Sequence, residues 1–179
     1  DTSNVVSVTL LPGLNCHCTP VYTIGCNNGA QVGGVTTTLG LTNISNTGTG
    51  CTQTDGLGYT DYSATHSVSA AHSSMVDIKV DVANYSGGVK IWVDWNQNGV
   101  FEASEIVGAS TSTIPNLSFY QTSFMVPSAA LAGPTKMRVR VVESSTTFDA
   151  CSSASYGEVE DYEFVVIQGT PCAGMPSID

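Results

Sequence analysis

Hydrophobic and polar residues alternate along much of the chain, which is the pattern of strands with one buried and one solvent-facing side. In "DIKVDV" (77–82), Ile78, Val80 and Val82 fall on one side and the charged residues on the other. Gly, Asn and Pro separate such runs, and helical periodicity is almost absent. We expect strands at 4–11, 32–41, 67–70, 75–82, 88–95, 118–126, 135–143 and 159–167, and one helical turn at 126–133.

Regularly spaced strands with turn residues between them predict an all-β fold. We expect an antiparallel β-sandwich of the jelly-roll or immunoglobulin-like kind, with disulfides and a calcium-type loop. No linker-like composition interrupts residues 15–167. The predicted organisation is one sandwich domain at 14–168, an N-terminal strand extension at 1–13 that could act as a donor strand, and a C-terminal tail at 169–179.

Charge excludes several partners. Of 179 residues only 11% are charged, and 15 acidic against 5 basic residues give a formal net charge of −10. Nucleic acids and anionic membrane surfaces bind clustered Lys and Arg, which this chain lacks. No stretch approaches the roughly 20 apolar residues of a membrane span, so we expect no membrane insertion. Divalent cations and neutral molecules remain as partners.

The six cysteines form an even set scattered along the chain, which is typical of disulfides in an oxidising compartment. We expect three disulfides, in an order that spacing does not determine, and an extracellular or cell-surface location. The "CHC" run at 16–18 has the wrong spacing for a zinc knuckle, and His17 is only a lesser metal candidate. The chain opens without a signal-peptide pattern, so we expect any signal peptide to have been removed. The cysteines are Cys16, Cys18, Cys26, Cys51, Cys151 and Cys172.

The stretch "DWNQNGVFEASE" (94–105) has the ligand spacing of a twelve-residue EF-hand loop. Gly99, at the sixth position, permits the sharp turn that such a loop needs. A strand-like run, "VKIWV", enters the loop where a calcium sensor would have a helix, so we expect the ion to be structural. The expected Ca²⁺ ligands are Asp94, Asn96, Asn98, the carbonyl of Val100, Glu102 and Glu105.

Two alternatives stay open around this loop. Its Asn and Asp side chains could instead bond nearby backbone N–H groups in a turn without an ion. Glu158, Glu160 and Asp161 could complete or neighbour the calcium site from the last strand, or they could form a buried ion pair with Arg138 or Arg140.

Three stretches taken together, "VKIWVDWNQNGVFEASE", "VP…G…KMRVRV" and "YGEVEDYEFVV", resemble the GEVED domain, which is named after the run at 157–161. The upstream residues "CTP…GC…LTNISNTGTGC…YTDYSA" resemble the segment that commonly precedes this domain, so the resemblance extends over roughly residues 16–167. It implies a β-sandwich module of large secreted or surface-bound bacterial proteins, found beside proteases, glycan-active domains and adhesion repeats, with no enzymatic activity of its own. The opening "DTSNVVSVTLLPG" is not part of the family pattern.

Catalytic signatures are not apparent. His17, His66 and His72 do not form a nucleophile or metal motif. Glu158 and Glu160 could act as paired carboxylates in a glycosidase, but a structural role explains them better. We therefore expect a protein that is not an enzyme.

The favoured function is a structural or adhesive subunit that polymerises head to tail into a surface fibre. In "NVVSVTLLPG", Val6, Val8 and Leu10 share one side of a terminal strand and must be buried somewhere. The strand could fold back onto its own sandwich, or it could be added to the sheet of a neighbouring copy, and repetition of the second arrangement makes a filament.

The alternative function is a carbohydrate-binding accessory module of a secreted enzyme. Aromatic rings could stack on sugars, although strand tryptophans are more often core residues. The sequence also carries three Asn-x-Ser sequons, which leave room for glycosylation of the protein itself. The candidate aromatic residues are Trp92, Trp95, Tyr59, Tyr62, Tyr85 and Tyr120, and the sequons begin at Asn43, Asn84 and Asn116.

Overall fold

The computed structural model of the chain describes residues 17–51 and 58–168. The strand predicted at 4–11 and the tail at 169–179 lie outside the described residues, as do Cys16 and Cys172.

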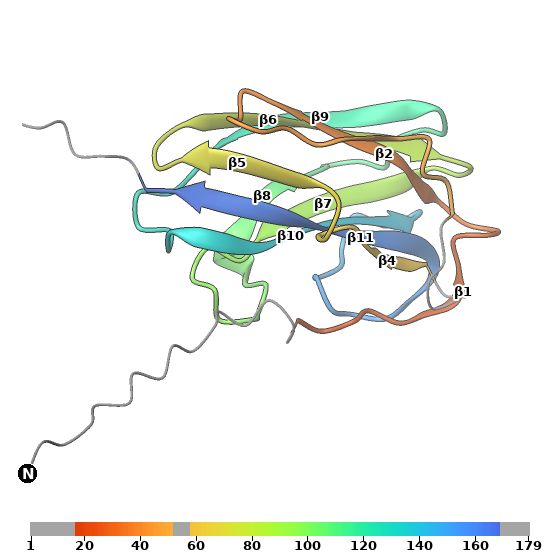
Figure 1. Cartoon of the computed structure of the whole chain (residues 1–179). Coiled ribbons are helices and arrows are strands. Elements are labelled where there is room, and N and C mark those ends of the chain that lie inside the picture. The colour runs from red at the N-terminus through yellow and green to blue at the C-terminus, as the bar shows by residue number, and fades with distance from the viewer. Residues whose placement is uncertain (1–16, 52–57, 169–179) are drawn as a thin grey trace, which may run out of the picture.

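The described residues are almost entirely strands and loops (Figure 1). The strands are β1 (Tyr22–Gly25), β2 (Gln31–Thr38), β3 (Ser45–Thr47), β4 (Tyr59–Asp61), β5 (Ser67–Ala71), β6 (Met75–Ala83), β7 (Gly87–Val93), β8 (Ile106–Ala109), β9 (Ser118–Met125), β10 (Gly133–Glu143) and β11 (Ala154–Ile167). A single 3-10 turn, η1, spans Ala103–Glu105.

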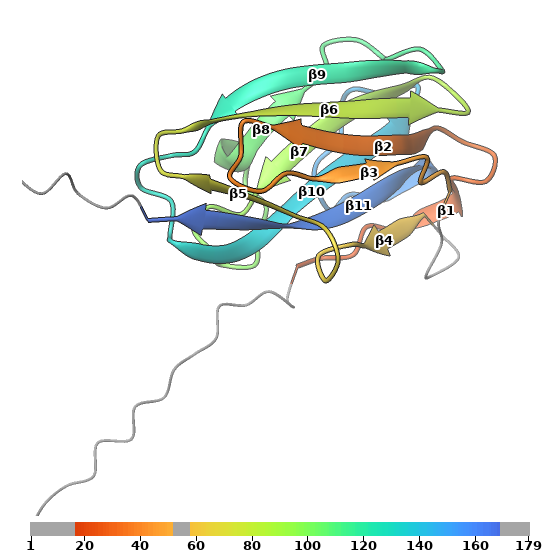
Figure 2. The ribbon, with the colours of Figure 1, turned by 45° about the horizontal axis from the view of Figure 1, so that its top comes forward.

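The strands form two sheets that pack face to face, which confirms the all-β prediction. One sheet has the order β1-β11-β10-β7-β8, and β4 and β5 also pair with β11. The other has the order β3-β2-β6-β9, and Figure 2 shows these four strands side by side with β9 at the outer edge. Alternate residues of both sheets, such as Val80 of β6 and Val139 of β10, fill a common core. The hydrophobic residues at alternate positions of the strands therefore form the contact between the two sheets.

The pairing of β11 differs from a purely antiparallel sandwich. β10 lies antiparallel along one edge of this 14-residue strand. Its other edge is covered in turn by β1, β4 and β5, and all three run parallel to it. Each of these strands has only three to five residues, so three are needed to cover one long edge. Without them that edge would present unpaired backbone groups.

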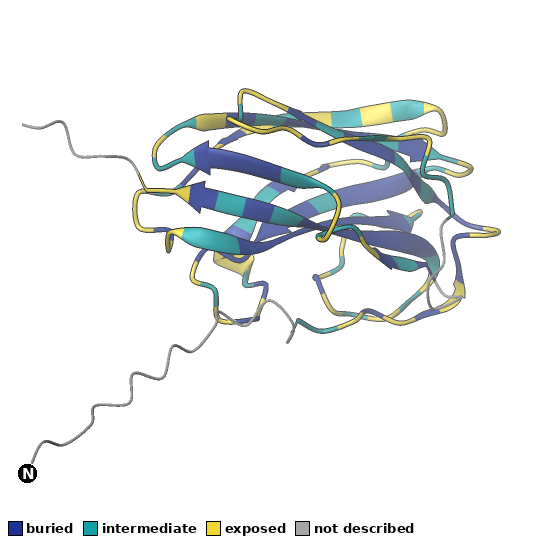
Figure 3. Ribbon diagram, in the orientation of Figure 1, coloured by how far each residue is buried: buried dark blue, intermediate teal, exposed yellow. Residues whose placement is uncertain are grey.

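Burial differs between the two sheets (Figure 3). Buried and partly exposed residues alternate along β6, as its sequence predicts. In β10, by contrast, eight consecutive residues are buried on both sides of the strand. The outer side of β10 lies under the N-terminal segment with Tyr22 and the loops that carry Phe101 and Phe148. The larger sheet therefore has a second, polar interior that contains Arg138 and Arg140.

The prediction of a helical turn at 126–133 is wrong. The segment makes a turn in which the Ala130 N–H donates to the Pro127 carbonyl at 3.1 Å. The next strand starts at Gly133, whose φ of +116° is outside the helical region. The connection crosses between strands of opposite sheets, and residues 126–132 make this one turn without helical structure.

Candidate functional site

The loop at 94–105 leaves the end of β7 and is held to both sheets. The Asp94 N–H donates to the Lys136 carbonyl of β10 at 3.1 Å, and the Thr135 hydroxyl donates to the Asp94 carbonyl at 2.5 Å. Trp95 turns into the sandwich core, where its ring lies 5.1 Å from that of Phe164. The first residues of the loop are therefore fixed by the fold.

Asp94 organises the turn that follows. Its two carboxylate oxygens accept the N–H groups of Asn98 at 3.2 Å and Gly99 at 3.0 Å. Gly99 has a φ of +83°, which is the left-handed conformation expected at the sixth position. The amide oxygens of Asn96 and Asn98 accept the N–H groups of Asn98 at 3.0 Å and Val100 at 2.8 Å.

The two glutamates close the loop at its end. Glu105 accepts the N–H groups of Glu102 at 3.0 Å and Asn96 at 3.3 Å, so that it joins the two ends of the loop. The Glu102 carboxylate accepts the side-chain amides of Asn96 at 2.8 Å and Asn98 at 3.0 Å. Burial raises the pKa of Glu105, and the negative charges of Asp94 and Glu102 act in the same direction.

The structure thus brings the side chains of the predicted calcium loop together, and hydrogen bonds within the loop hold them in place. These are the hydrogen bonds expected for a turn without an ion, which was the stated alternative to a calcium site. Among the described residues, no group of three or more His, Cys, Asp or Glu side chains has the arrangement of a metal site. The donor chemistry nonetheless suits Ca²⁺, because three carboxylates and two amide oxygens meet around a glycine turn.

His17, named from the sequence only as a lesser metal candidate, lies beside this loop, and that contact was not predicted. Its Nε2 lies 2.8 Å from Asp94 Oδ2, its ring packs 4.6 Å from that of Phe101, and both members of the pair are almost fully buried. Burial lowers the pKa of His17, against the raising effect of Asp94. The two residues are 77 positions apart, so no local motif could reveal the contact.

Asp161 forms the buried ion pair that was one of the two alternatives. Its carboxylate accepts Arg138 Nε at 2.7 Å and Nη2 at 2.8 Å, and both side chains are fully buried. Tyr59 donates a third hydrogen bond to it at 2.9 Å. Although burial disfavours the charge of Arg138, Asp161 raises the pKa of its guanidinium. Arg138 therefore takes both oxygens that Asp161 could offer to an ion.

Glu158 and Glu160 point to the opposite side of β11, between the sheets, because side chains alternate along a strand. Glu158 accepts the Val32 N–H of β2 at 2.9 Å, beside the bulge in that strand. Glu160 accepts the Tyr162 hydroxyl at 2.6 Å with one oxygen, and its other oxygen, Oε1, has no hydrogen-bond partner. Burial raises the pKa of Glu160 to about 7.

Gly157 begins this acidic run for a steric reason. It has a φ of +147°, and a Cβ there would lie 2.3 Å from the Val141 carbonyl and 2.7 Å from the Tyr22 ring. A side chain would therefore clash with β10 and displace Tyr22. Gly157, Glu158 and Asp161 thus each have a packing, hydrogen-bonding or charge partner in another part of the fold.

Comparison with known protein families identifies the same region. Residues 88–165 match the GEVED domain. A comparison with curated proteins gives no match at the level of individual sequences.

The GEVED match begins in β7 and ends in β11, so it covers the calcium-type loop and the acidic run but not the strands before them. The resemblance inferred from the sequence began further upstream, at residue 16. Strands β2 and β6 contribute to the same core as the matched strands. The matched residues are therefore one part of a larger folded sandwich.

Two disulfides lie within the described residues and fix the segments outside the GEVED match. Cys18 pairs with Cys151, which ties the His17 segment to the loop before β11. Cys26 pairs with Cys51, within the first part of the chain.

The aromatic residues named for sugar binding are mostly enclosed. Trp92 and Trp95 are buried, Tyr59, Tyr62 and Tyr120 are partly buried, and Tyr85 is exposed. The three sequon asparagines, Asn43, Asn84 and Asn116, all lie on the surface.

Proposed function

We propose that this chain is a non-catalytic extracellular protein with a structural or adhesive role, whose copies join by strand addition into a surface fibre. The observation that carries the proposal is the edge strand β9. It has eight residues and, among the described strands, pairs only with β6. An edge strand of this length can accept a strand from another chain.

The pairing register shows which groups β9 offers. The Val126 N–H donates to the Ser74 carbonyl at 2.9 Å, immediately beyond the strand. Because N–H and C=O groups alternate in direction along a strand, the next groups directed at β6 belong to residues 124, 122 and 120. At the start of the strand the Leu117 N–H donates to the Val82 carbonyl of β6, and the Ser118 N–H donates to the Pro115 carbonyl. The backbone groups that point to the open edge therefore belong to Phe119, Gln121, Ser123 and Met125.

The corner beside β9 also has apolar surface to cover. Val107, Ile114 and Tyr120 are only partly buried, and they pack against the core near this edge. Residues 4–11 match β9 in length and place three aliphatic side chains on one side. Burial of each contributes roughly 1.5 to 3 kcal/mol, which with the backbone hydrogen bonds can offset the cost of association.

The proposal of a non-catalytic role is supported by the placement of the paired carboxylates. Glu158 and Glu160 are fully buried between the sheets, where no substrate can reach them without unfolding the sandwich. An extracellular location is supported by the two disulfides, which persist in oxidising compartments. Within the described residues, no helix is long and apolar enough to cross a membrane.

Calcium is proposed here as a structural ion of the loop at 94–105. Asp94, Glu102 and Glu105 would supply carboxylate oxygens, Asn96 and Asn98 amide oxygens, and Val100 its carbonyl. The ion would replace hydrogen bonds that now join these side chains within the loop. His17 and the backbone N–H groups would continue to hold Asp94 in place.

The assembly proposal is tested by light scattering of the 179-residue chain over a range of concentrations. We expect concentration-dependent polymers, and monomers after deletion of residues 1–11. Val8→Asp places a charge on the side to be buried and should dissociate the polymers, whereas Thr9→Asp, on the other side of the strand, should not. A full-length chain that stays monomeric at every concentration would refute strand addition.

The calcium proposal is tested by thermal unfolding of metal-stripped protein. Added Ca²⁺ should raise the melting temperature by mass action on the folded state. Glu105→Gln should remove most of the rise, while Glu163→Gln, on β11, should leave it intact. Equal melting temperatures with Ca²⁺ and with chelator would show that the loop is an ion-free turn.

A further inference from the structure

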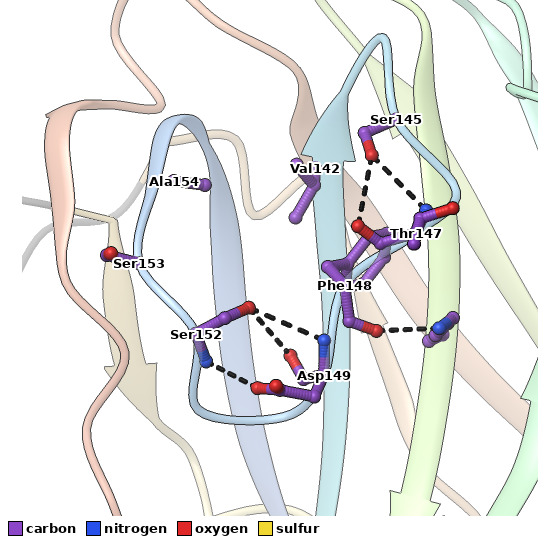
Figure 4. A pocket seen from close by; sticks show the side chains of 9 residues that line it. Val142, Ser145, Thr147, Phe148, Asp149, Ser152, Ser153 and Ala154 are labelled. Atoms are coloured by element: carbon purple, nitrogen blue, oxygen red, sulfur yellow. Dashed lines mark hydrogen bonds between the residues drawn. The ribbon is translucent and has the colours of Figure 1, made fainter.

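A cleft of about 570 Å³ lies on the outer side of the larger sheet, beneath the loop that connects β10 to β11 (Figure 4). Its lining combines Lys90 of β7, Val142 of β10 and Ala154 of β11 with residues of the connecting loop. Ligand-binding clefts commonly have volumes of roughly 300 to 1,000 Å³. The cleft is therefore large enough for a small organic ligand.

Two cations meet at this cleft without a carboxylate partner. Lys90 on β7 lies directly opposite Arg140 on β10, in a pairing that places like charges side by side. The other three basic side chains of the protein, Lys79, Lys136 and Arg138, each have a carboxylate within 4 Å. No carboxylate of the described residues lies that close to Lys90 or Arg140. In a chain of net charge −10, positive charge without a partner is concentrated here.

Main-chain oxygens hold both cations in position. Lys90 Nζ donates to the Phe148 carbonyl at 2.6 Å, which leaves two of its three N–H groups for other acceptors. Arg140, which is fully buried below the loop, donates to the carbonyls of Asp149 and Ser152 and to the Tyr22 hydroxyl. Arg140 thus anchors the loop, whereas Lys90 lines the cleft and can contact a ligand.

The loop itself is preformed. Asp149 accepts the N–H groups of Cys151 at 2.9 Å and Ser152 at 2.6 Å, and Cys151 is tied to Cys18 by a disulfide. Ser145 bridges the backbone of Thr147. A ligand would therefore meet a fixed set of hydroxyl groups around Phe148, whose ring lies 5.0 Å from Lys90 Nζ.

Asp149 contributes the one negative charge of the lining. The backbone N–H groups of Cys151 and Ser152 lower the pKa of this carboxyl, and Arg140 acts in the same direction. The charges of Lys90 and Arg140 together exceed that of Asp149. The local balance remains positive, which favours an anionic group on the ligand.

We infer that the cleft between the 144–153 loop and Lys90 binds a sugar that carries a carboxylate group. Lys90 would bind the carboxylate, the serine and threonine hydroxyls would bind the sugar hydroxyls, and the apolar surface of Phe148 and Val142 would contact the ring. This inference goes beyond strand addition, because the cleft and β9 belong to different sheets. Either proposal can fail without the other.

The test is an NMR titration of the full chain with two matched probes, methyl β-D-glucuronide and methyl β-D-glucoside. They differ only at C6, which is a carboxylate in the first and a hydroxymethyl group in the second. We expect the glucuronide to shift the backbone amides of residues 145–153 and to bind at least tenfold more tightly than the glucoside. Lys90→Gln should weaken glucuronide binding about tenfold or more, the effect of losing a charge-assisted hydrogen bond. Lys79→Gln, on the other sheet, is the matched control and should have no effect.

A titration with sodium acetate distinguishes recognition of the sugar from the attraction of any carboxylate to Lys90. Acetate should bind much more weakly than the glucuronide if the hydroxyls and Phe148 contribute. Equal binding of acetate and glucuronide, or of glucoside and glucuronide, would overturn the inference, as would unshifted loop amides at saturating glucuronide. These comparisons use the unmodified chain, so they remain decisive even if Lys90→Gln fails to fold.

Discussion

Replacing Glu160 with glutamine should make the protein more stable at neutral pH and remove a pH dependence. In the folded chain this carboxyl lies between the sheets, with one oxygen on Tyr162 and the other without a partner. Burial raises its pKa from an ordinary value of 4.5 to about 7. In the unfolded chain, where it is solvated, it ionises near the ordinary value.

The sign and size of the effect follow from this difference. Between pH 4.5 and about 7 the folded state retains a proton that the unfolded state has released, so stability falls as pH rises through that window. At 1.36 kcal/mol per pKa unit, the loss is about 3 kcal/mol at pH 8. Glutamine cannot ionise, and so it avoids the loss.

Urea unfolding of both proteins at pH 5, 6, 7 and 8 measures the difference. Near pH 5 the two free energies of unfolding should be similar, apart from the cost of burying the amide. At pH 8 the Glu160→Gln protein should be more stable by up to about 3 kcal/mol. Burial also lowers the pKa of His17, but its contribution is common to both proteins and cancels in the difference. A stability difference that does not vary between pH 5 and 8 would refute the reasoning.

Three further predictions concern the packing around the acidic run. Arg138→Met removes the bidentate partner of the buried Asp161 and leaves it the Tyr59 hydroxyl and Lys136 Nζ at 3.9 Å, so it should lower the free energy of unfolding by up to about 3 to 5 kcal/mol; a change below about 1 kcal/mol would show that water reaches the pair. Gly157→Ala should cost about 1 to 3 kcal/mol because of strain and overpacking, measured by the urea midpoint, and an unchanged midpoint would contradict the clash with Tyr22. Replacing Cys18 and Cys151 together with serine should cost about 2 to 5 kcal/mol, and unaltered thermal unfolding would contradict a stabilising role.

The strands that carry a clear hydrophobic period could be predicted from the sequence. Alternation over 75–82 identified β6 almost to the residue, because one side of that strand faces the core. The strands β1, β3, β4 and β8 were missed. Each has only three or four residues. They form because a longer strand provides an edge for pairing, and the local sequence pattern carries no information about that edge.

In the loop at 94–105, too, features that depend on neighbouring residues could be predicted, whereas contacts with distant residues could not. Its turn, its glycine and its side-chain convergence follow from spacing within twelve residues. Its contact with His17 depends on how the N-terminal segment crosses the sheet, and the disulfide at Cys18 helps to fix that path. The pairing of Asp161 with Arg138 was one of two stated alternatives, and only the register of β10 against β11 decides between them.

Strand addition to β9 can be observed by hydrogen exchange at the edge of the sheet. A synthetic peptide of residues 1–13 is added to the chain that lacks residues 1–11, and exchange of individual β9 amides is followed by NMR. If β9 accepts the added strand, the amides of Phe119, Gln121, Ser123 and Met125 become protected, while those already directed at β6 change little. If exchange at these four amides is the same with and without saturating peptide, β9 is not the acceptor strand.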